Sequence, residues 1–214
     1  MSSYLTEAIG TFFLVLTIGL AVLSGNPLAP LAIGAILMAM VYMGGHISGA
    51  HYNPAVSVAA LIGGKMDRRD LFPYIVAQLV GAMLASFSVL IILGQTFVPS
   101  PGVDAGILSV LMSEIFFAFA VVLVVLNVAM NDATAGNSFY GAAIGFVVMA
   151  GIFAVGDVSG GVFNPAVGVG FILIDAFVAG GSLDNLWVYI VGPIIGGLVA
   201  VKAFDIQHLE ASST

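Results

Sequence analysis

Two asparagines stand out among the polar residues of this 214-residue chain, because each begins the same tripeptide, Asn-Pro-Ala. The two copies consist of Asn53, Pro54 and Ala55, and of Asn164, Pro165 and Ala166. An asparagine caps a helix by accepting a backbone amide with its side-chain oxygen, and proline suits the first helical turn. Each tripeptide therefore predicts a helix start whose asparagine keeps its NH2 group free to donate to a solute oxygen.

The two tripeptides lie in matched surroundings, SGAHYNPAVSVA (48–59) and SGGVFNPAVGVG (159–170). The offset is 111 residues (164 − 53) throughout, and seven of the twelve positions are identical. A single copy could be only a turn followed by a helix start. Two copies at a fixed offset, inside an apolar chain, instead indicate one site to which both segments contribute.

Further candidates for chemistry are four titratable residues in or beside apolar segments, Glu7, Glu114, His46 and His51. A carboxylate within a membrane needs hydrogen-bond donors, which the amides of a loop can supply. Alternatively, Glu7 is close enough to the terminus for its side chain to extend to water. Nothing near the histidines completes a metal site, so we expect both to pack within a loop, with pH gating as the alternative.

The same inventory argues against catalysis. The chain has no cysteine, which excludes thiolate metal sites and cysteine nucleophiles. It also offers no plausible nucleophile–base pair or metal cluster. We therefore expect no catalytic residue, no cofactor and no metal, and a protein that is not an enzyme.

The composition indicates that lipid surrounds most of the chain. Hydrophobic residues make up 61% and charged residues 7%, whereas a soluble domain carries about 25% charged residues. The lipid bilayer is therefore an expected partner. The net charge of −7 argues against nucleic acid as another.

Apolar runs near the roughly 20 residues of a membrane span predict six helices, at 5–24, 30–46, 70–94, 107–128, 138–156 and 187–205. The first run follows no basic segment and precedes no cleavage site, so we interpret it as a retained helix rather than a signal peptide. Two shorter runs, 55–63 and 166–175, begin just after the prolines. They read as re-entrant half-helices, whose non-helical entry segments are tolerated at membrane depth only within protein or beside water.

The order of elements repeats, which predicts an all-α membrane protein of six transmembrane helices, two re-entrant half-helices and two inverted halves, 1–106 and 107–214. Three spans per half is an odd number, so the second half starts from the opposite side of the membrane. The two half-helices then meet N-terminus to N-terminus near the midplane. Their partial positive charges repel cations and hydronium, which predicts passive conduction of small uncharged molecules.

The basic residues predict the orientation. Lys65, Arg68 and Arg69 share one loop, and Lys202 ends the last helix. An even number of spans places both termini on the side of that loop. Because cytoplasmic loops carry an excess of Lys and Arg, we expect both termini to be cytoplasmic in the plasma (cell inner) membrane.

With GHISGAHYNPAV (45–56) and SGGVFNPAV (159–167) in place, the whole chain resembles the major intrinsic protein family, the aquaporins and aquaglyceroporins. The resemblance implies one pore per subunit and a homotetramer. It implies that Asn53 and Asn164 lie at the pore centre and that Glu7 and Glu114 orient the pore-loop backbone. His46 and His51 match pore-loop histidines of the family, while Gln78 and Pro193 are supporting matches.

The chain departs from the family at the narrowest point of the pore. Counting from the motifs, the four filter positions fall on Ile33, Ile152, Gly161 and Val167. Family members usually carry an aromatic residue and an arginine there, and water-selective ones also carry a histidine. Without these groups the filter loses bulk, a fixed charge and up to five donors, so we expect it to be wide and aliphatic.

The sequence thus predicts a passive channel for water and/or small neutral solutes, with glycerol, urea, hydrogen peroxide, ammonia and gases as candidates. The alternative is a closed or structural membrane protein of the same fold with little flux, because a hydrophobic constriction can block flow by dewetting. An energised transporter is disfavoured, since the spans hold few titratable groups for ion coupling.

Overall fold

The structure is a computed structural model that describes residues 1–208. The elements in this part of the chain are all helical: α1 (Ser2–Leu23), α2 (Ala29–Ser48), α3 (Pro54–Ile62), α4 (Arg68–Leu93), α5 (Ile107–Ala129), the 3-10 helix η1 (Asp132–Thr134), α6 (Tyr140–Ser159), α7 (Pro165–Ala179) and α8 (Val188–His208). Among these, α1, α2, α4, α5, α6 and α8 are long and apolar enough to cross a membrane. The prediction of an all-α integral membrane protein with six spans is confirmed.

The two remaining α-helices are the short ones that follow the Asn-Pro-Ala prolines. α3 has 9 residues and α7 has 15, fewer than the roughly 20 that a span requires. The predicted end of the second half-helix at residue 175 is wrong, because α7 continues to Ala179. Asp175 lies inside the helix, and its carboxylate accepts a hydrogen bond from the Thr96 hydroxyl in the α4–α5 connection.

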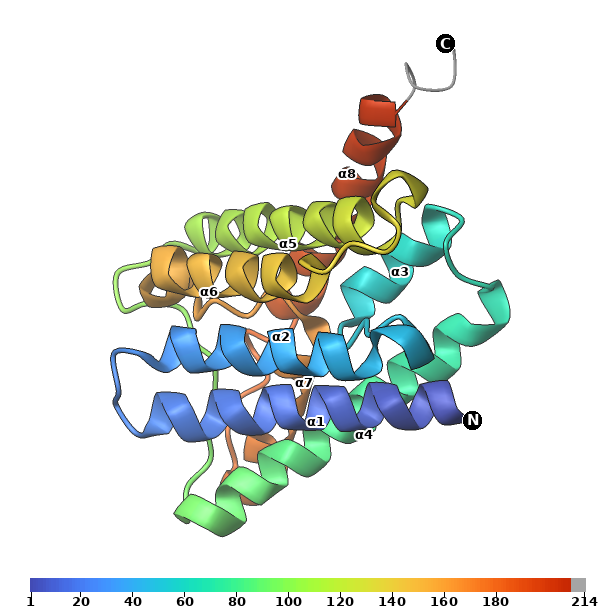
Figure 1. The fold of residues 1–214 in the computed structure, drawn as a ribbon. Coiled ribbons are helices and arrows are strands. Elements are labelled where there is room, and N and C mark those ends of the chain that lie inside the picture. The colour runs from blue at the N-terminus through green and yellow to red at the C-terminus, as the bar shows by residue number, and fades with distance from the viewer. Residues whose placement is uncertain (209–214) are drawn as a thin grey trace.

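The helices pack in two corresponding sets (Figure 1). α1 packs against α2 and α4, and α5 packs in the same way against α6 and α8. The short helices connect the two sets, because α3 packs against α8 and α7 packs against α4. This correspondence supports the division into 1–106 and 107–214 that we propose.

Glycine allows the same close helix crossing in each set. A Cβ atom at Gly81 of α4 would overlap the Ala8 carbonyl oxygen of α1. A Cβ atom at Gly196 of α8 would likewise overlap the Ile115 carbonyl oxygen of α5. Small residues let helix backbones approach closely in membranes, where apolar side chains gain little by leaving lipid.

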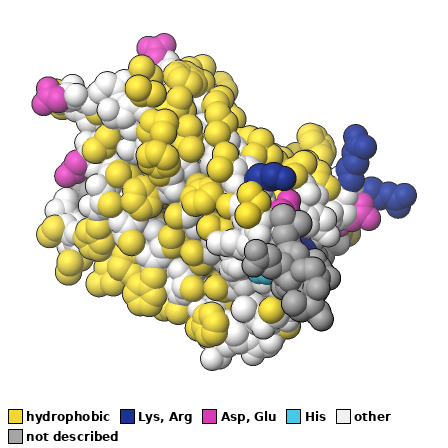
Figure 2. Space-filling view, turned by 90° about the horizontal axis from the view of Figure 1, so that it is seen from above, with side chains coloured by type: hydrophobic (Ala, Val, Ile, Leu, Met, Phe, Trp, Pro, Cys, Tyr) yellow, Lys and Arg dark blue, Asp and Glu magenta, His cyan; other side chains and the backbone are white. Residues whose placement is uncertain are grey.

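The two ends of the helix bundle differ in charge. The N-terminus and the α3–α4 loop lie at one end (Figure 1), which we call the basic end because it carries Lys65, Arg68 and Arg69. The opposite, acidic end carries Asp104 and Asp184 in its loops. In Figure 2 the visible Lys and Arg side chains gather at one end, hydrophobic side chains cover much of the surface between the ends, and the charged side chains visible at the far end are all Asp or Glu.

Candidate pore and its filter

The two half-helices begin at their asparagines. Asn53 and Asn164 are extended N-cap residues, with φ of −156° and −149°. The Asn53 side-chain oxygen accepts the Ala55 amide at 2.8 Å, and the Asn164 oxygen accepts the Ala166 amide at 2.9 Å. Pro54 and Pro165 occupy the first helical position, where no amide donor is needed.

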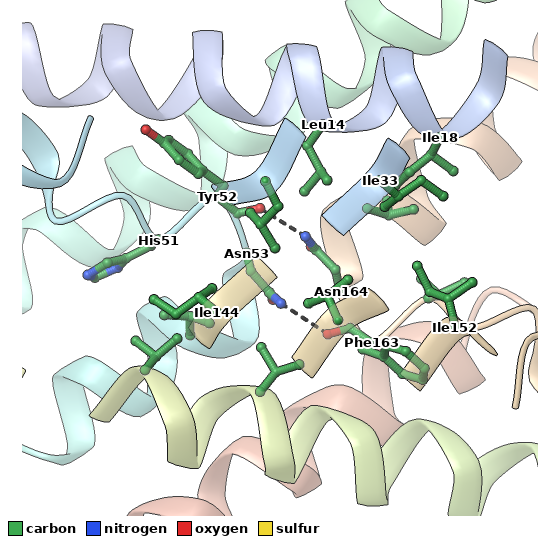
Figure 3. Close-up of a pocket in the computed structure, with 18 of the residues that line it drawn as sticks. Leu14, Ile18, Ile33, His51, Tyr52, Asn53, Ile144, Ile152, Phe163 and Asn164 are labelled. Atoms are coloured by element: carbon green, nitrogen blue, oxygen red, sulfur yellow. Dashed lines mark hydrogen bonds between the residues drawn. The ribbon is translucent and has the colours of Figure 1, made fainter. Parts of the chain in front are cut away.

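The same asparagines tie the two segments together. The Asn53 NH2 group donates to the Phe163 carbonyl at 3.0 Å, and the Asn164 NH2 group donates to the Tyr52 carbonyl at 2.9 Å (Figure 3). The prediction that these NH2 groups are free is therefore wrong for one hydrogen of each. Because an NH2 group has two hydrogens, each asparagine keeps one donor for the cavity that both side chains line.

The loops before the half-helices adopt unusual backbone conformations. Ala50, Tyr52 and Phe163 have φ near +50° (51°, 49° and 52°), and Gly161 has φ of +64°. Non-glycine residues rarely occupy this left-handed region and do so when the surrounding structure holds them there. The holding groups here are two buried glutamates.

Glu7 and Glu114 both have 0% exposure, and each carboxylate accepts hydrogen bonds from the loop of its own half. The Glu7 donors are the Ser48 hydroxyl (2.7 Å), the amides of His51 (3.0 Å) and Tyr52 (2.7 Å), and the Gln78 NH2 group (2.8 Å). The Glu114 donors are the Ser159 hydroxyl (2.8 Å) and the amides of Val162 (3.0 Å) and Phe163 (2.6 Å). The alternative of a Glu7 side chain extended to water does not fit this burial.

The glutamates also direct the loop carbonyl groups. In a trans peptide the N–H and C=O bonds point in opposite directions, and the described residues contain no cis peptide bond. Amides that face the glutamates therefore turn four carbonyl groups away from them, those of Ala50, His51, Gly161 and Val162. These residues line the central cavity, so their carbonyl oxygens are available there as acceptors beside the asparagine donors.

Three cavities follow one another through the bundle. The central one, around Asn53 and Asn164, has a volume of about 40 Å³, which is room for about three water-sized molecules. A cavity of about 480 Å³ opens at the acidic end and one of about 380 Å³ at the basic end. The central cavity and the acidic-end cavity share Ile18, Ile33, Ile152, Gly161, Val162 and Val167.

All four predicted filter positions, Ile33, Ile152, Gly161 and Val167, belong to this shared ring. The ring contains no charged, aromatic or hydrogen-bonding side chain, but its side chains leave little surface exposed, which does not fit the wide filter that the sequence predicts. Branched aliphatic side chains occupy the space instead, since Ile33 is only 2% exposed and Val167 only 3%. Ile152 also packs against Gly161. A Cβ atom added at Gly161 would lie 3.3 Å from the Cα atom of Ile152.

The structure separates the two candidate histidines. His51 is buried (8% exposed) and lies in the loop before α3, with Nδ1 3.0 Å from the Ser57 hydroxyl. His46 lies exposed in the last turn of α2 and lines none of the three cavities. Within residues 1–208 no group of three potential ligands is placed to hold a metal ion.

Several residues of this site were not predicted from the sequence. Leu14 and Ile18 of α1 line the cavity, as do Val121 and Val125 of α5, and an aliphatic residue in an apolar helix carries no signal of this position. Ser57 could have been found, because it lies four residues after Asn53 and so shares its face of the half-helix.

Comparisons with known proteins agree with this geometry. The family model described as "Major intrinsic protein" matches residues 1–204. The chain is 37% identical over 226 residues to Glycerol uptake facilitator protein-like 6 of Lactiplantibacillus plantarum, covering 98% of this chain and 100% of the relative. It is 33% identical over 236 residues to Aquaporin AqpM of Methanothermobacter thermautotrophicus, covering 94% and 95%. The solved aquaglyceroporin of Plasmodium falciparum has a TM-score of 0.83 at 22% identity, covering 99% and 98%.

Proposed function

Since the chain belongs to the major intrinsic protein family, we propose that its pore selects solutes by an aliphatic filter followed by a polar centre. As a family member it is a passive channel for water and small neutral solutes and not an enzyme. What remains to be proposed is which solutes pass, and through which residues.

The observation that carries the proposal is the contrast between the filter and the centre of the pore. The ring of Ile33, Ile152, Gly161 and Val167 offers no side-chain hydrogen bond, whereas Asn53 and Asn164 each offer an N–H immediately beyond it. A solute in the ring gives up part of its hydration, which costs an ion far more than a neutral molecule. At the centre, the positive N-terminal ends of α3 and α7 further oppose cations.

The permeants that fit are small, uncharged and partly apolar, and we propose glycerol as the principal organic one. Its CH and CH2 groups can face the aliphatic ring while its hydroxyls meet the central donors and the loop carbonyl oxygens. The name of the relative from Lactiplantibacillus plantarum supports this choice. Water, urea, hydrogen peroxide, ammonia and dissolved gases are the other candidates, since they too are small and neutral.

The membrane setting is part of the same proposal. The basic loop of Lys65, Arg68 and Arg69 supports a cytoplasmic position for the N-terminus and for the end of α8, in the plasma membrane. The family supports a homotetramer with one pore per subunit. In this orientation the acidic-end cavity is the external mouth of the pore.

Stopped-flow light scattering on proteoliposomes tests the function. We expect vesicles with the protein to shrink and reswell faster than empty vesicles for water and for glycerol. Rates equal to those of empty vesicles for water, glycerol and urea would instead support the closed or structural alternative.

A substitution at the filter tests the residues. Val167→Arg adds a charge and up to five donors to a ring that faces a cavity of about 480 Å³. We expect it to reduce glycerol and urea permeability at least about tenfold, which corresponds to about 1.4 kcal/mol, and water permeability less. Val167→Leu, which adds bulk without charge, is the matched control. An unchanged solute profile in Val167→Arg would show that residue 167 does not line the constriction.

A further inference from the structure

We propose that the start of α4 is a binding site for one anionic phospholipid, with Arg68 and Arg69 on the lipid phosphate and Phe72 against an acyl chain. The site lies on the outside of the helix bundle, so it goes beyond the proposed function and holds whichever solutes pass. It also goes beyond the orientation of the chain, because it assigns the lipid to two of the four basic residues.

The first turns of α4 have two different sides. Asp70 and Tyr74 lie on the side of the pore, since both line the cavity at the basic end. With about 100° between successive residues of a helix, Arg68, Arg69 and Phe72 project from the other side. None of these three residues lines any of the three cavities of the conduction path. The two arginines therefore have no role in lining the pore.

The outer side of α4 continues as a row of exposed apolar side chains at intervals of three or four residues. Phe72 is 75% exposed, and the side chains that follow are between 41% and 69% exposed: Val76, Val80, Leu84, Phe87 and Ile91. On a helix that crosses a membrane, such a row faces the lipid tails. α4 has 26 residues, more than the roughly 20 of a span. We therefore place Phe72 where the apolar core begins and the arginines at the level of the headgroups.

The carboxylates beside the arginines make their hydrogen bonds elsewhere. The Asp67 Oδ1 atom accepts the backbone amide of Arg69 at 2.9 Å, and the Asp70 Oδ1 atom accepts the Tyr4 hydroxyl at 2.7 Å. Neither contact uses a guanidinium group, and both carboxylates line the basic-end cavity on the side of the pore. The arginine side chains are exposed, and Figure 2 shows Lys and Arg side chains that project outward at this end.

A phospholipid with a net negative headgroup is the ligand that this surface fits. A guanidinium group presents its N–H donors in a planar fork that matches phosphate oxygens in pairs. In phosphatidylcholine the ammonium group offsets the phosphate charge, whereas phosphatidylglycerol keeps it, so two arginines favour the second lipid. Because the chain as a whole carries a net charge of −7, such a preference has to come from a local site.

The other two basic residues lack this combination of charge and apolar surface. Lys65 lines the basic-end cavity and so belongs to the mouth of the pore. Lys202 is an exposed single charge on α8. Lys202 therefore serves as the control for a general attraction between basic residues and an anionic membrane.

The corresponding position at the acidic end carries the opposite charge. Tyr-Ile-Val occurs in α4 from residue 74 and in α8 from residue 189, an offset of 115 (189 − 74). By this offset Trp187 corresponds to Phe72, and it is likewise exposed (46%). Asp184, however, corresponds to Arg69. An aromatic residue is thus present at both ends, whereas the pair of cations is present only at the basic end.

Native mass spectrometry with dioleoyl phosphatidylglycerol and dioleoyl phosphatidylcholine tests the site, because these two lipids share their acyl chains. We expect the unsubstituted protein to retain more phosphatidylglycerol than phosphatidylcholine. In Arg68→Gln/Arg69→Gln the ratio of the two bound lipids should fall about fivefold for each arginine removed. Arg68→Lys/Arg69→Lys keeps the charge but loses the planar fork, so it should keep a smaller preference.

Two further variants separate the parts of the site. Lys202→Gln should leave the ratio of bound lipids unchanged. Phe72→Ala should lower the retention of both lipids and leave their ratio unchanged, because it acts on the acyl chain that they share. All the substituted side chains are exposed, and thermal unfolding followed by circular dichroism checks that each variant is folded.

Three outcomes would overturn the site. The first is an unchanged ratio in Arg68→Gln/Arg69→Gln. The second is an equal fall in Lys202→Gln, which would indicate a general attraction to the charged end. The third is displacement of phosphatidylglycerol by millimolar inorganic phosphate, which would indicate an anion site that does not need a lipid. Because none of these measurements uses solute flux, a failure of the proposed function in proteoliposomes would leave this site standing.

Discussion

The two pore loops of this molecule share one backbone arrangement but differ in the side chains around it. In each half a buried glutamate accepts two consecutive loop amides and one serine hydroxyl. A tyrosine hydroxyl then donates to the carbonyl of that serine, from Tyr74 to Ser48 at 2.8 Å and from Tyr189 to Ser159 at 2.7 Å. The groups that hold the backbone are thus duplicated.

The differences lie where the side chains face the pore or pack against a neighbouring helix. In the first half, His51 of the loop, Ser57 of α3 and Gln78 of α4 are linked by hydrogen bonds. At the corresponding positions the second half has Val162 in the loop, Gly168 in α7 and Pro193 in α8. The comparison teaches that both halves keep the groups that hold the loop backbone, whereas positions that do not hold it differ in polarity and size.

The largest expected effect concerns the two glutamates. In Glu114→Gln the new NH2 group would face backbone amides, because the counterpart of Gln78 in this half is Pro193, which has no acceptor in its side chain. Leaving two buried donors unpaired predicts a loss of about 3 kcal/mol or more in the free energy of unfolding. Titration with SDS, followed by circular dichroism, measures it.

Glu7→Gln is the matched comparison and should lose less, about 1–2 kcal/mol. The side-chain oxygen of Gln78 has no partner in this structure, so a rotated Gln78 amide can accept the new NH2 group of residue 7. A larger loss in Glu7→Gln than in Glu114→Gln would contradict this role of the glutamine.

An intermediate effect is expected where serine and glycine replace each other in the two half-helices. A Cβ atom at Gly168 would lie 2.6 Å from the Cβ of Tyr189 on α8. Gly168→Ser therefore forces two helices apart, and overpacking of this kind predicts a loss of about 1–3 kcal/mol. Thermal unfolding in detergent measures it, and a variant as stable as the unsubstituted protein would show that α7 can move.

The reciprocal change, Ser57→Ala, creates no overlap and removes one hydroxyl. We expect it to cost about 0.5–1.5 kcal/mol, less than Gly168→Ser. The ordering is the informative result, since it separates a position limited by packing from one limited by hydrogen bonds. The reverse ordering would mean that the α7–α8 contact is less rigid than the Gly168–Tyr189 distance indicates.

The contrast between a shared backbone arrangement and differing side chains also explains what the sequence could predict. Long apolar runs and two Asn-Pro-Ala copies were enough for the six spans and the two half-helices, because hydropathy and capping act locally. The filter positions could be counted from the motifs, but the volume they leave could not. That volume depends on how the branched side chains of Ile33 and Ile152, from two different helices, fill the space.

Long-range hydrogen bonds were also beyond the sequence. The Asn53–Phe163 and Asn164–Tyr52 bonds join residues 110 and 112 positions apart, and their backbone acceptors have no sequence signature. Gln78 was visible only as a match to a family pattern. Its role became clear when the structure placed its NH2 group between Glu7 and Ser57.

The smallest expected effect concerns a hydroxyl that one half has and the other lacks. Thr11 of α1 is fully buried, and its Oγ1 atom has no hydrogen-bond partner among the described residues. By the offset between Glu7 and Glu114, the corresponding residue of α5 is Ala118, which is equally buried. Thr11→Val keeps the shape and removes the unpaired hydroxyl, so we expect the free energy of unfolding to rise by about 0.5–1 kcal/mol.

Thr6→Val, on the same helix, is the matched control for this last prediction. The Thr6 hydroxyl donates to the Ser2 carbonyl at 2.9 Å, so its removal should leave stability unchanged or lower it slightly. Both variants are compared by SDS titration under identical conditions. If Thr11→Val is instead the less stable of the two, the Thr11 hydroxyl has a partner such as a bound water, and the two halves differ by a buried polar contact rather than by an unpaired group.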